Sequence, residues 1–212
     1  MSVYKLYYFN SRGRAEPCRL AFAAANIEYE DKRLDSEEWQ KEKKSGRPPF
    51  GTMPFIETPE GYFLGGGWPI TKYICKLAGL SPVDLLEEAT ADMIVDGVDG
   101  VMGSLVEWFK EQDQANKEKL KKTLHEVTLP AYLEKFEVIL KRKNEGQGFF
   151  FGEKLTYADI FFFYLCNIFA EEQQEVVPFQ LKPFKLLVNL YNRVHNLPQI
   201  KAWIEKRPKT QY

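Results

Sequence analysis

The spacing of the apolar residues changes once along this chain of 212 residues. Up to about Leu80, short segments rich in β-branched and aromatic residues alternate with short helical segments. After Asp84, apolar residues recur every three or four positions, which is the spacing of amphipathic helices. We therefore expect two domains: an α/β domain over residues 1–79 and an all-helical domain over residues 85–212, joined by a linker over residues 80–84.

The first domain is expected to have a thioredoxin-like fold. Its strands and helices are predicted in the order β-α-β-α-β-β-α, with Pro69 suited to the first position of the last helix. Ser36 is predicted to cap the short central helix. The expected elements are a strand (3–10), a helix (15–25), a strand (28–34), the helix that Ser36 caps, a hairpin (54–57 and 62–64) and a helix (68–78).

The second domain is expected to be a set of packed helices. A long amphipathic helix is predicted from about Leu86 to Phe109. The next helix, over residues 117–143, contains Pro130, which removes a backbone donor and should kink it. The remaining helices are expected to start at the capping-box pattern Thr156 to Asp159 and to cover residues 183–196 and 198–207.

Composition excludes several classes of partner. The 29 basic and 30 acidic residues nearly cancel, so neither nucleic acid nor an anionic membrane is expected to bind. The longest apolar stretch, residues 160–170, is too short to span a bilayer, and the N-terminal residues lack an apolar signal segment. Three distant cysteines (Cys18, Cys75 and Cys166) and two histidines indicate neither a disulfide framework nor a metal site. We expect a cytoplasmic protein without a metal cofactor.

Four segments, in order along the chain, resemble one family. They are YKLYYFNSRGRAEPCRLAFAAANIEYEDKRL (4–34), FGTMPFIE (50–57), TYADI (156–160) and LPQIKAWIEKRP (197–208). Together they resemble the sigma class of the glutathione transferases. The resemblance implies a thioredoxin-like domain followed by an all-helical domain, a homodimer, and glutathione as the cosubstrate.

The resemblance also implies two catalytic positions. In this family a tyrosine at the end of the first strand donates a hydrogen bond to the glutathione sulfur, and Tyr8 stands at that position. A donor to sulfur favours the thiolate, which is the form that attacks electrophiles. Arg14 matches an arginine that assists near the thiol in this class.

Further glutathione contacts are implied by the same resemblance. Trp39 and Lys43 match residues that hold the glycyl end of the tripeptide. Met53 and Pro54 match a cis-proline turn, where the backbone before the proline pairs with the cysteinyl part like an added strand.

The chain departs from the family where the γ-glutamyl part of glutathione should bind. The family has a Gln-Ser or Glu-Ser pair there, whereas this chain has Gly66 and Gly67, and Pro69 lacks a nearby N–H. Each lost hydrogen bond to a charged group costs about 1.5–3 kcal/mol, so two or three losses weaken binding roughly 10²–10⁴-fold. In the family, an acidic residue on the first long helix reaches across the dimer to the γ-glutamyl amine. An alignment without gaps places Gly100 at that position, and a shift of one residue places Asp99 there; both alignments stay open.

The glycines also leave room for a larger ligand. The family has an apolar pocket beside the thiol, and Phe9, Gly13, Trp68, Met102 and Trp108 are predicted to line it in the cleft between the domains. One hypothesis is therefore a carrier of a bulky apolar molecule, such as a carotenoid or other pigment, haem or a lipid. The alternatives are an active transferase or isomerase that uses glutathione, and a structural protein like the crystallins derived from this class.

Overall fold

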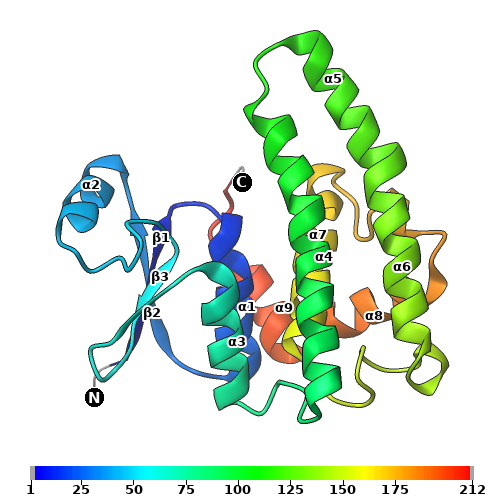
Figure 1. The fold of residues 1–212 in the computed structure, drawn as a ribbon, viewed down its shortest axis with the longest axis horizontal. Coiled ribbons are helices and arrows are strands. Elements are labelled where there is room, and N and C mark those ends of the chain that lie inside the picture. Colours follow the sequence, from blue (N-terminus) through cyan, green and yellow to red (C-terminus); the bar gives the residue numbers. More distant parts are fainter. Residues whose placement is uncertain (1–2, 211–212) are drawn as a thin grey trace. The chain divides into compact units, whose positions relative to one another are not determined.

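The computed structural model describes residues 3–210 (Figure 1). Two compact units are present: one covers the chain up to Ser81 and again from Leu197 on, and the other covers Pro82–Asn196. The expected linker, residues 80–84, contains the point at which the chain passes from the first unit to the second. The domain bounds of 1–79 and 85–212 stay a prediction.

The first unit is built on a four-stranded mixed sheet with the strand order β2-β1-β3-β4. β1 is parallel to β2 and antiparallel to β3, and β3 is antiparallel to β4, which confirms the predicted thioredoxin-like fold. The elements of this unit are β1 (Tyr4–Phe9), the 3₁₀ turn η1 (Gly13–Ala15), α1 (Glu16–Ala25), β2 (Tyr29–Leu34), α2 (Ser36–Lys44), β3 (Phe55–Glu57), β4 (Phe63–Gly65), α3 (Gly67–Leu77) and α9 (Pro198–Lys206).

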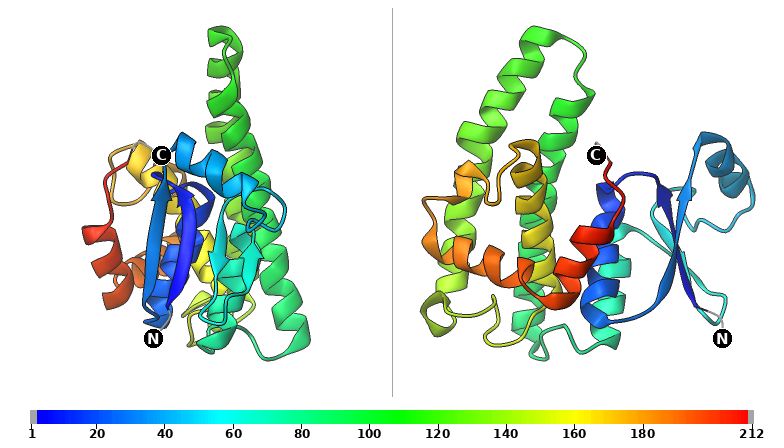
Figure 2. Two further views of the ribbon diagram at one scale, coloured as in Figure 1. Left: turned by 90° about the vertical axis from the view of Figure 1, so that its left-hand side faces the viewer. Right: turned by 180° about the vertical axis from the view of Figure 1, so that it is seen from behind.

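The sheet and its helices share one apolar core. Leu6 of β1 lies opposite Ile56 of β3, and both side chains are fully buried. α1 packs against α3 on one side and against α9 on the other, as the right-hand view of Figure 2 shows for the first and last helices of the chain. Phe22 of α1 and Ile74 of α3 are fully buried in that core. Burial of such side chains contributes about 1.5–3 kcal/mol each.

Two helix starts differ from the expectation by one or two residues. α2 is capped by Asp35 and not by Ser36: the Asp35 carboxylate accepts the Glu38 N–H, and Glu38 accepts the Asp35 N–H in return. The predicted cap was wrong because the reciprocal pair three residues apart is stronger than a single hydroxyl. α3 begins at Gly67, so Pro69 is its third residue. At this position a backbone N–H would have no partner inside the helix, so the missing N–H of proline costs no helical hydrogen bond.

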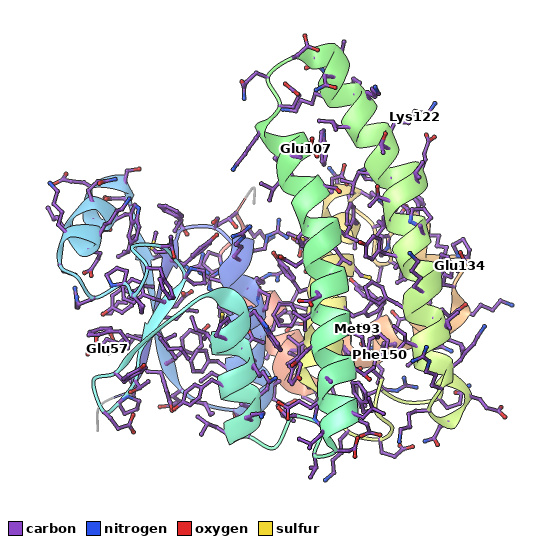
Figure 3. The ribbon with its side chains drawn as sticks, viewed as in Figure 1. Glu57, Met93, Glu107, Lys122, Glu134 and Phe150 are labelled. Atoms are coloured by element: carbon purple, nitrogen blue, oxygen red, sulfur yellow. The ribbon has the colours of Figure 1, made fainter. Side chains whose placement is uncertain are left out.

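The second unit is a set of helices around α7, whose side chains are almost all buried. α4 and α8 pack directly on α7, and α6 packs on α4 and α8. Phe150, labelled in Figure 3, meets the ring of Phe162 edge-on at a centroid distance of 5.7 Å. The elements of this unit are α4 (Leu85–Lys110), α5 (Gln114–Thr123), the π-helical turn η2 (Leu124–Thr128), α6 (Leu129–Lys141), the 3₁₀ turns η3 (Asn144–Gly146) and η4 (Phe179–Leu181), α7 (Tyr157–Glu172) and α8 (Lys185–His195).

The helix expected over residues 117–143 is present as α5, η2 and α6 in uninterrupted succession. Its irregularity is a π-helical turn that ends directly before Leu129 and Pro130, with the Leu129 N–H donating to the Leu124 carbonyl. Because Pro130 has no N–H, the turn before it cannot keep the regular helical ladder. The predicted disturbance at this proline therefore takes the form of a wider turn.

The predicted capping box at the start of α7 is confirmed. The buried Asp159 carboxylate accepts hydrogen bonds from the Thr156 N–H at 2.8 Å and from the Phe150 N–H at 2.9 Å. Burial raises the pKa of Asp159 to about 6, against the opposing effect of these donors. One side chain thus starts the central helix and fixes the segment that precedes it.

Candidate functional site

The Tyr8 hydroxyl is held by the turn that follows β1. It accepts a hydrogen bond from the Arg14 N–H at 3.1 Å. Gly13 makes this possible, because it has a φ of +41° and a Cβ there would lie 2.6 Å from the Tyr8 hydroxyl oxygen. Since the oxygen acts as an acceptor toward the turn, the phenolic proton remains the group that can donate to a bound sulfur.

Glycine is required at both positions where the family carries its polar pair. Gly66 has a φ of +92°, in the region that L side chains avoid. A Cβ on Gly67 would overlap the backbone carbonyl of Arg14. The start of α3 therefore lies directly against the turn that holds Tyr8.

The start of α3 also offers few donors to an anion. The Gly66 N–H donates to the Pro54 carbonyl at 2.8 Å, and Pro69 has no N–H. Helix N-termini bind anions through their free backbone N–H groups, so one of these donors is occupied here and another is missing. Beneath them, the Gly67 carbonyl accepts hydrogen bonds from Thr71 at 2.7 Å and from the Cys18 thiol at 3.4 Å.

The remaining glutathione positions lie in the same unit. The peptide bond between Met53 and Pro54 is cis, as expected. Trp39 is half-buried and meets Phe9 edge-on at 6.4 Å, and Lys43 is exposed on α2. The predicted positions that the structure brings into mutual contact are Tyr8, Phe9, Gly13, Arg14, Trp39, Pro54, Gly66 and Gly67.

The predicted apolar site draws on both units. Phe9 is 40% exposed, and Trp68 is half-buried with the Lys72 Nζ 5.1 Å from its ring. Met102 and Trp108 belong to α4 of the second unit. Met102 is half-buried, whereas Trp108 is 8% exposed and stacks on the Phe109 ring at 4.8 Å.

The glycines of α4 have a packing reason inside the second unit. A Cβ on Gly100 would lie 2.8 Å from the Tyr132 hydroxyl, and one on Gly97 would lie 3.2 Å from the Phe136 ring. α4 and α6 can therefore approach closely only where side chains are absent. An acid at position 100 would displace Tyr132, while Asp99 is exposed.

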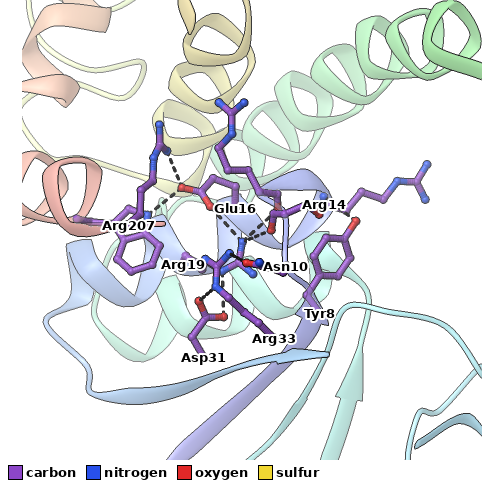
Figure 4. A network of polar contacts seen from close by, with 11 residues as sticks. Tyr8, Asn10, Arg14, Glu16, Arg19, Asp31, Arg33 and Arg207 are labelled. Atoms are coloured by element: carbon purple, nitrogen blue, oxygen red, sulfur yellow. Dashed lines mark hydrogen bonds and ion pairs between the residues drawn. The ribbon is translucent and has the colours of Figure 1, made fainter. Parts of the chain in front are cut away.

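A buried group of charged side chains behind the Tyr8 turn was not predicted from the sequence (Figure 4). Glu16 and Arg19 of α1 are 2% and 0% exposed. Arg19 donates to Asp31 on β2, and Glu16 accepts hydrogen bonds from Trp203 and Arg207. The only local signal is the spacing of Glu16 and Arg19, which is also that of an ordinary surface ion pair.

No group of three or more His, Cys, Asp or Glu side chains within residues 3–210 could hold a metal ion. The three cysteines are buried, and burial raises the pKa of the Cys18 thiol to about 12. In the same range of residues, no helix has both the length and the apolarity needed to cross a membrane.

Comparison with known proteins agrees with this geometry. The family model for the glutathione S-transferase N-terminal domain matches residues 4–74, and the model for the C-terminal domain matches residues 100–207. The chain is 36% identical to hematopoietic prostaglandin D synthase of Gallus gallus over 210 residues, which cover 99% of each chain. The chain belongs to the glutathione S-transferase family, and these matches agree with its sigma class.

Two further relatives are an S-crystallin and a glutathione S-transferase described as monomeric. S-crystallin 4 of Enteroctopus dofleini is 28% identical, with full coverage of both chains. A crystal structure of monomeric Na-GST-3, a glutathione S-transferase of the hookworm Necator americanus, is 32% identical with a TM-score of 0.84 and covers 99% of this chain and 100% of its own.

Proposed function

We propose that this protein holds glutathione weakly and binds a bulky, largely apolar molecule beside Tyr8. The observation that carries the proposal is the glycine pair at the start of α3. Gly66 has a left-handed backbone and Gly67 has no space for a Cβ, so neither position can present the family's polar side chains. The γ-glutamyl part of glutathione would lose its usual partners here.

The size of this loss supports weak binding. A missing hydroxyl, a missing amide side chain and an occupied backbone N–H correspond to two or three hydrogen bonds to a charged ligand. At about 1.5–3 kcal/mol each, they weaken binding roughly 10²–10⁴-fold.

The apolar surroundings support a different occupant. Phe9 is partly exposed beside Tyr8, and Trp68 stands next to the glycine pair. Burying a few hundred Å² of ligand at about 25 cal/mol per Å² supplies enough free energy for micromolar binding after ordering costs. Met102 and Trp108 remain predicted contacts of the same ligand.

A second candidate function is glutathione-dependent catalysis. One observation favours it: the Tyr8 hydroxyl accepts the Arg14 N–H and keeps its own proton for a sulfur atom. Trp39, Lys43 and the cis Met53–Pro54 turn are also retained. In this case Tyr8 would stabilise the thiolate and Arg14 would assist.

The decisive experiment combines two measurements on the purified protein. Native mass spectrometry and an absorption spectrum reveal a co-purified ligand, and calorimetry measures glutathione binding. We expect a bound apolar molecule, or saturable uptake of a carotenoid, haem or fatty acid, and glutathione binding in the millimolar range or weaker. Micromolar glutathione binding together with turnover of a standard electrophile would replace this proposal by the catalytic one.

A further inference from the structure

The buried charges behind the Tyr8 turn form a connected network within the first unit (Figure 4). At its centre is Arg19, which is fully buried in α1. Its Nε donates to Asp31 at 3.1 Å, and its Nη1 lies 3.2 Å from the Glu16 carboxylate. Buried guanidinium groups are rare unless they are paired in this way.

The same nitrogen of Arg19 also binds the turn itself. Nη1 donates to the Ser11 carbonyl at 2.8 Å and to the Arg12 carbonyl at 3.2 Å. Ser11 and Arg12 lie directly before Gly13 and Arg14 in the turn, and the Arg14 N–H donates to the Tyr8 hydroxyl. One side chain thus fixes the backbone that bonds to the candidate catalytic group.

Arg19 is also close to Tyr8 itself. Its guanidinium carbon lies 6.0 Å from the centroid of the Tyr8 ring, at the limit of a cation–π contact. The turn therefore holds the Tyr8 hydroxyl, and the Tyr8 ring faces the Arg19 guanidinium, which binds the same turn.

The end of the chain holds Arg19 in place through Glu16. Glu16 Oε1 accepts hydrogen bonds from the Trp203 indole at 2.8 Å and from Arg207 at 2.6 Å, while Oε2 faces Arg19. Burial by itself raises the pKa of Glu16, but the nearby charges of Arg207 and Arg19 lower it by more than that. The net pKa is below the usual value, so the carboxyl is ionised. Burial lowers the pKa of Arg19, but Asp31 and Glu16 raise it more.

A buried ion network is a costly way to gain stability. Apolar side chains of similar volume often stabilise a core as well or better. Apolar side chains cannot bind the Ser11 and Arg12 carbonyls and two carboxylates at once, whereas the planar guanidinium of Arg19 does. The buried charges are therefore better explained by a need to fix the position of the Tyr8 turn than by a gain in stability.

We propose that Arg19 is the positioning residue of the Tyr8 hydroxyl, held in turn by Glu16 and Arg207. The proposal goes beyond the proposed function, because it concerns the ligand-free protein and applies whether the occupant is glutathione or an apolar molecule.

The test measures the Arg14 amide by NMR in ligand-free protein. Its hydrogen-exchange rate and proton chemical shift report the bond to Tyr8, and a Tyr8→Phe variant gives the values for the lost bond. Arg19→Met is expected to speed Arg14 exchange at least about tenfold relative to the Leu6 amide of β1, and to move its shift toward that of Tyr8→Phe. Arg19→Lys, which keeps the charge without the fork, should have an intermediate effect.

The control is Arg33→Met, because Arg33 shares Asp31 with Arg19 but binds neither turn carbonyl. It should leave the Arg14 amide unchanged. If Arg19→Met speeds Arg14 and Leu6 exchange equally, Arg19 serves general stability only and the proposal is wrong. If that variant does not fold, an unchanged Arg14 shift in Arg19→Lys is the overturning result. Failure here would leave ligand binding untouched, and failure to bind a ligand would leave this result standing.

Discussion

The backbone carbonyl of Arg14 occupies the position that a Cβ atom on residue 67 would need. The same residue donates its N–H to the Tyr8 hydroxyl. The turn is therefore fixed on one side by Gly67 and on the other by Tyr8. Reinstating the family's serine at position 67 would move the backbone that orients the tyrosine.

This relationship predicts that Gly67→Ala destabilises the protein by about 1–3 kcal/mol, the usual cost of overpacking. Urea unfolding measures the change. The matched control is Gly103→Ala in α4, where no heavy atom lies within 4 Å of the added Cβ. It should stabilise by about 0.5–1 kcal/mol, because alanine favours helix over glycine. Equal effects of the two substitutions would show that the contact with Arg14 relaxes freely.

Tyr8→Phe separates the two candidate functions. If the protein conjugates glutathione, we expect kcat to fall at least about tenfold with little change in the Kd for glutathione, because the thiolate loses its donor. Steady-state kinetics with a chromogenic electrophile and calorimetry measure both quantities. Tyr4→Phe is the control, since it removes a phenolic hydroxyl from the same strand that hydrogen-bonds to Tyr73 at 3.3 Å. An unchanged kcat in Tyr8→Phe would exclude Tyr8 from the chemistry.

Trp68→Ala tests the apolar site. We expect the Kd for the apolar ligand to rise about fivefold or more, because large aromatic side chains dominate such contacts. Titration followed by ligand absorbance gives the value. Phe50→Ala removes an aromatic ring that is 87% exposed and outside the predicted site, so it should have no effect. Equal losses in both variants would point to non-specific adsorption.

His125 predicts a pH dependence of stability. Burial beside the Trp108 and Phe169 rings lowers the pKa of this imidazole, Glu172 raises it and Lys121 lowers it, and the net pKa is below the usual value. The unfolded chain then binds the proton more tightly, so the contribution of His125 to stability falls as pH drops through the ordinary histidine range. Asp159, whose pKa is raised to about 6, acts in the opposite direction, because the native state binds its proton more tightly.

Denaturant unfolding between pH 7.5 and 5.5 measures this effect. His125→Gln should remove the contribution of His125, because glutamine carries no titrating proton, so acidification should cost this variant less stability than the wild type. His195→Gln, which removes the other imidazole of the sequence, is measured in parallel. A slope that persists in His125→Gln would assign the pH dependence to another group.

The homodimer implied by the family is our last prediction. α4 presents Met93, which is 48% exposed, together with Asp96 and Asp99 on its outer side. We expect a dimer at micromolar concentration in sedimentation, and Met93→Asp should shift it toward monomer because a charge would enter the contact. A wild-type species of 24.7 kDa would contradict the dimer, and this chain would then behave as the hookworm relative is described.

Local patterns predicted the strands and α-helices and most of their extent, but not the separation of α5 from α6 by η2, nor η3 and η4. The periodicity identified α4 and α7, and the pair Thr156 and Asp159 identified the start of α7. The form of the disturbance at Pro130 could not be predicted, because a kink and a π-helical turn have the same local cause.

The sequence predicted which residues form the candidate site, but not why glycine stands at positions 66 and 67. Gly66 and Gly67 looked like lost polar groups, and only the backbone shows that a side chain at 67 would overlap Arg14. The network around Arg19 was missed because its partners are far apart in sequence. A Glu16–Arg19 pair on a helix gives no sign of burial until Asp31 and Arg207 are placed beside it.

The hydrogen bond between Glu16 and Arg207 joins residues 191 positions apart. During synthesis the Arg207 partner of Glu16 therefore leaves the ribosome 191 residues after Glu16 itself. Until then, the nascent N-terminal segment would have to bury an incompletely neutralised carboxylate or leave that part of its core open. The turn that holds Tyr8 is thus translated early and completed late, and a chain cut before Arg207 would lack one of the partners of the buried Glu16 carboxylate.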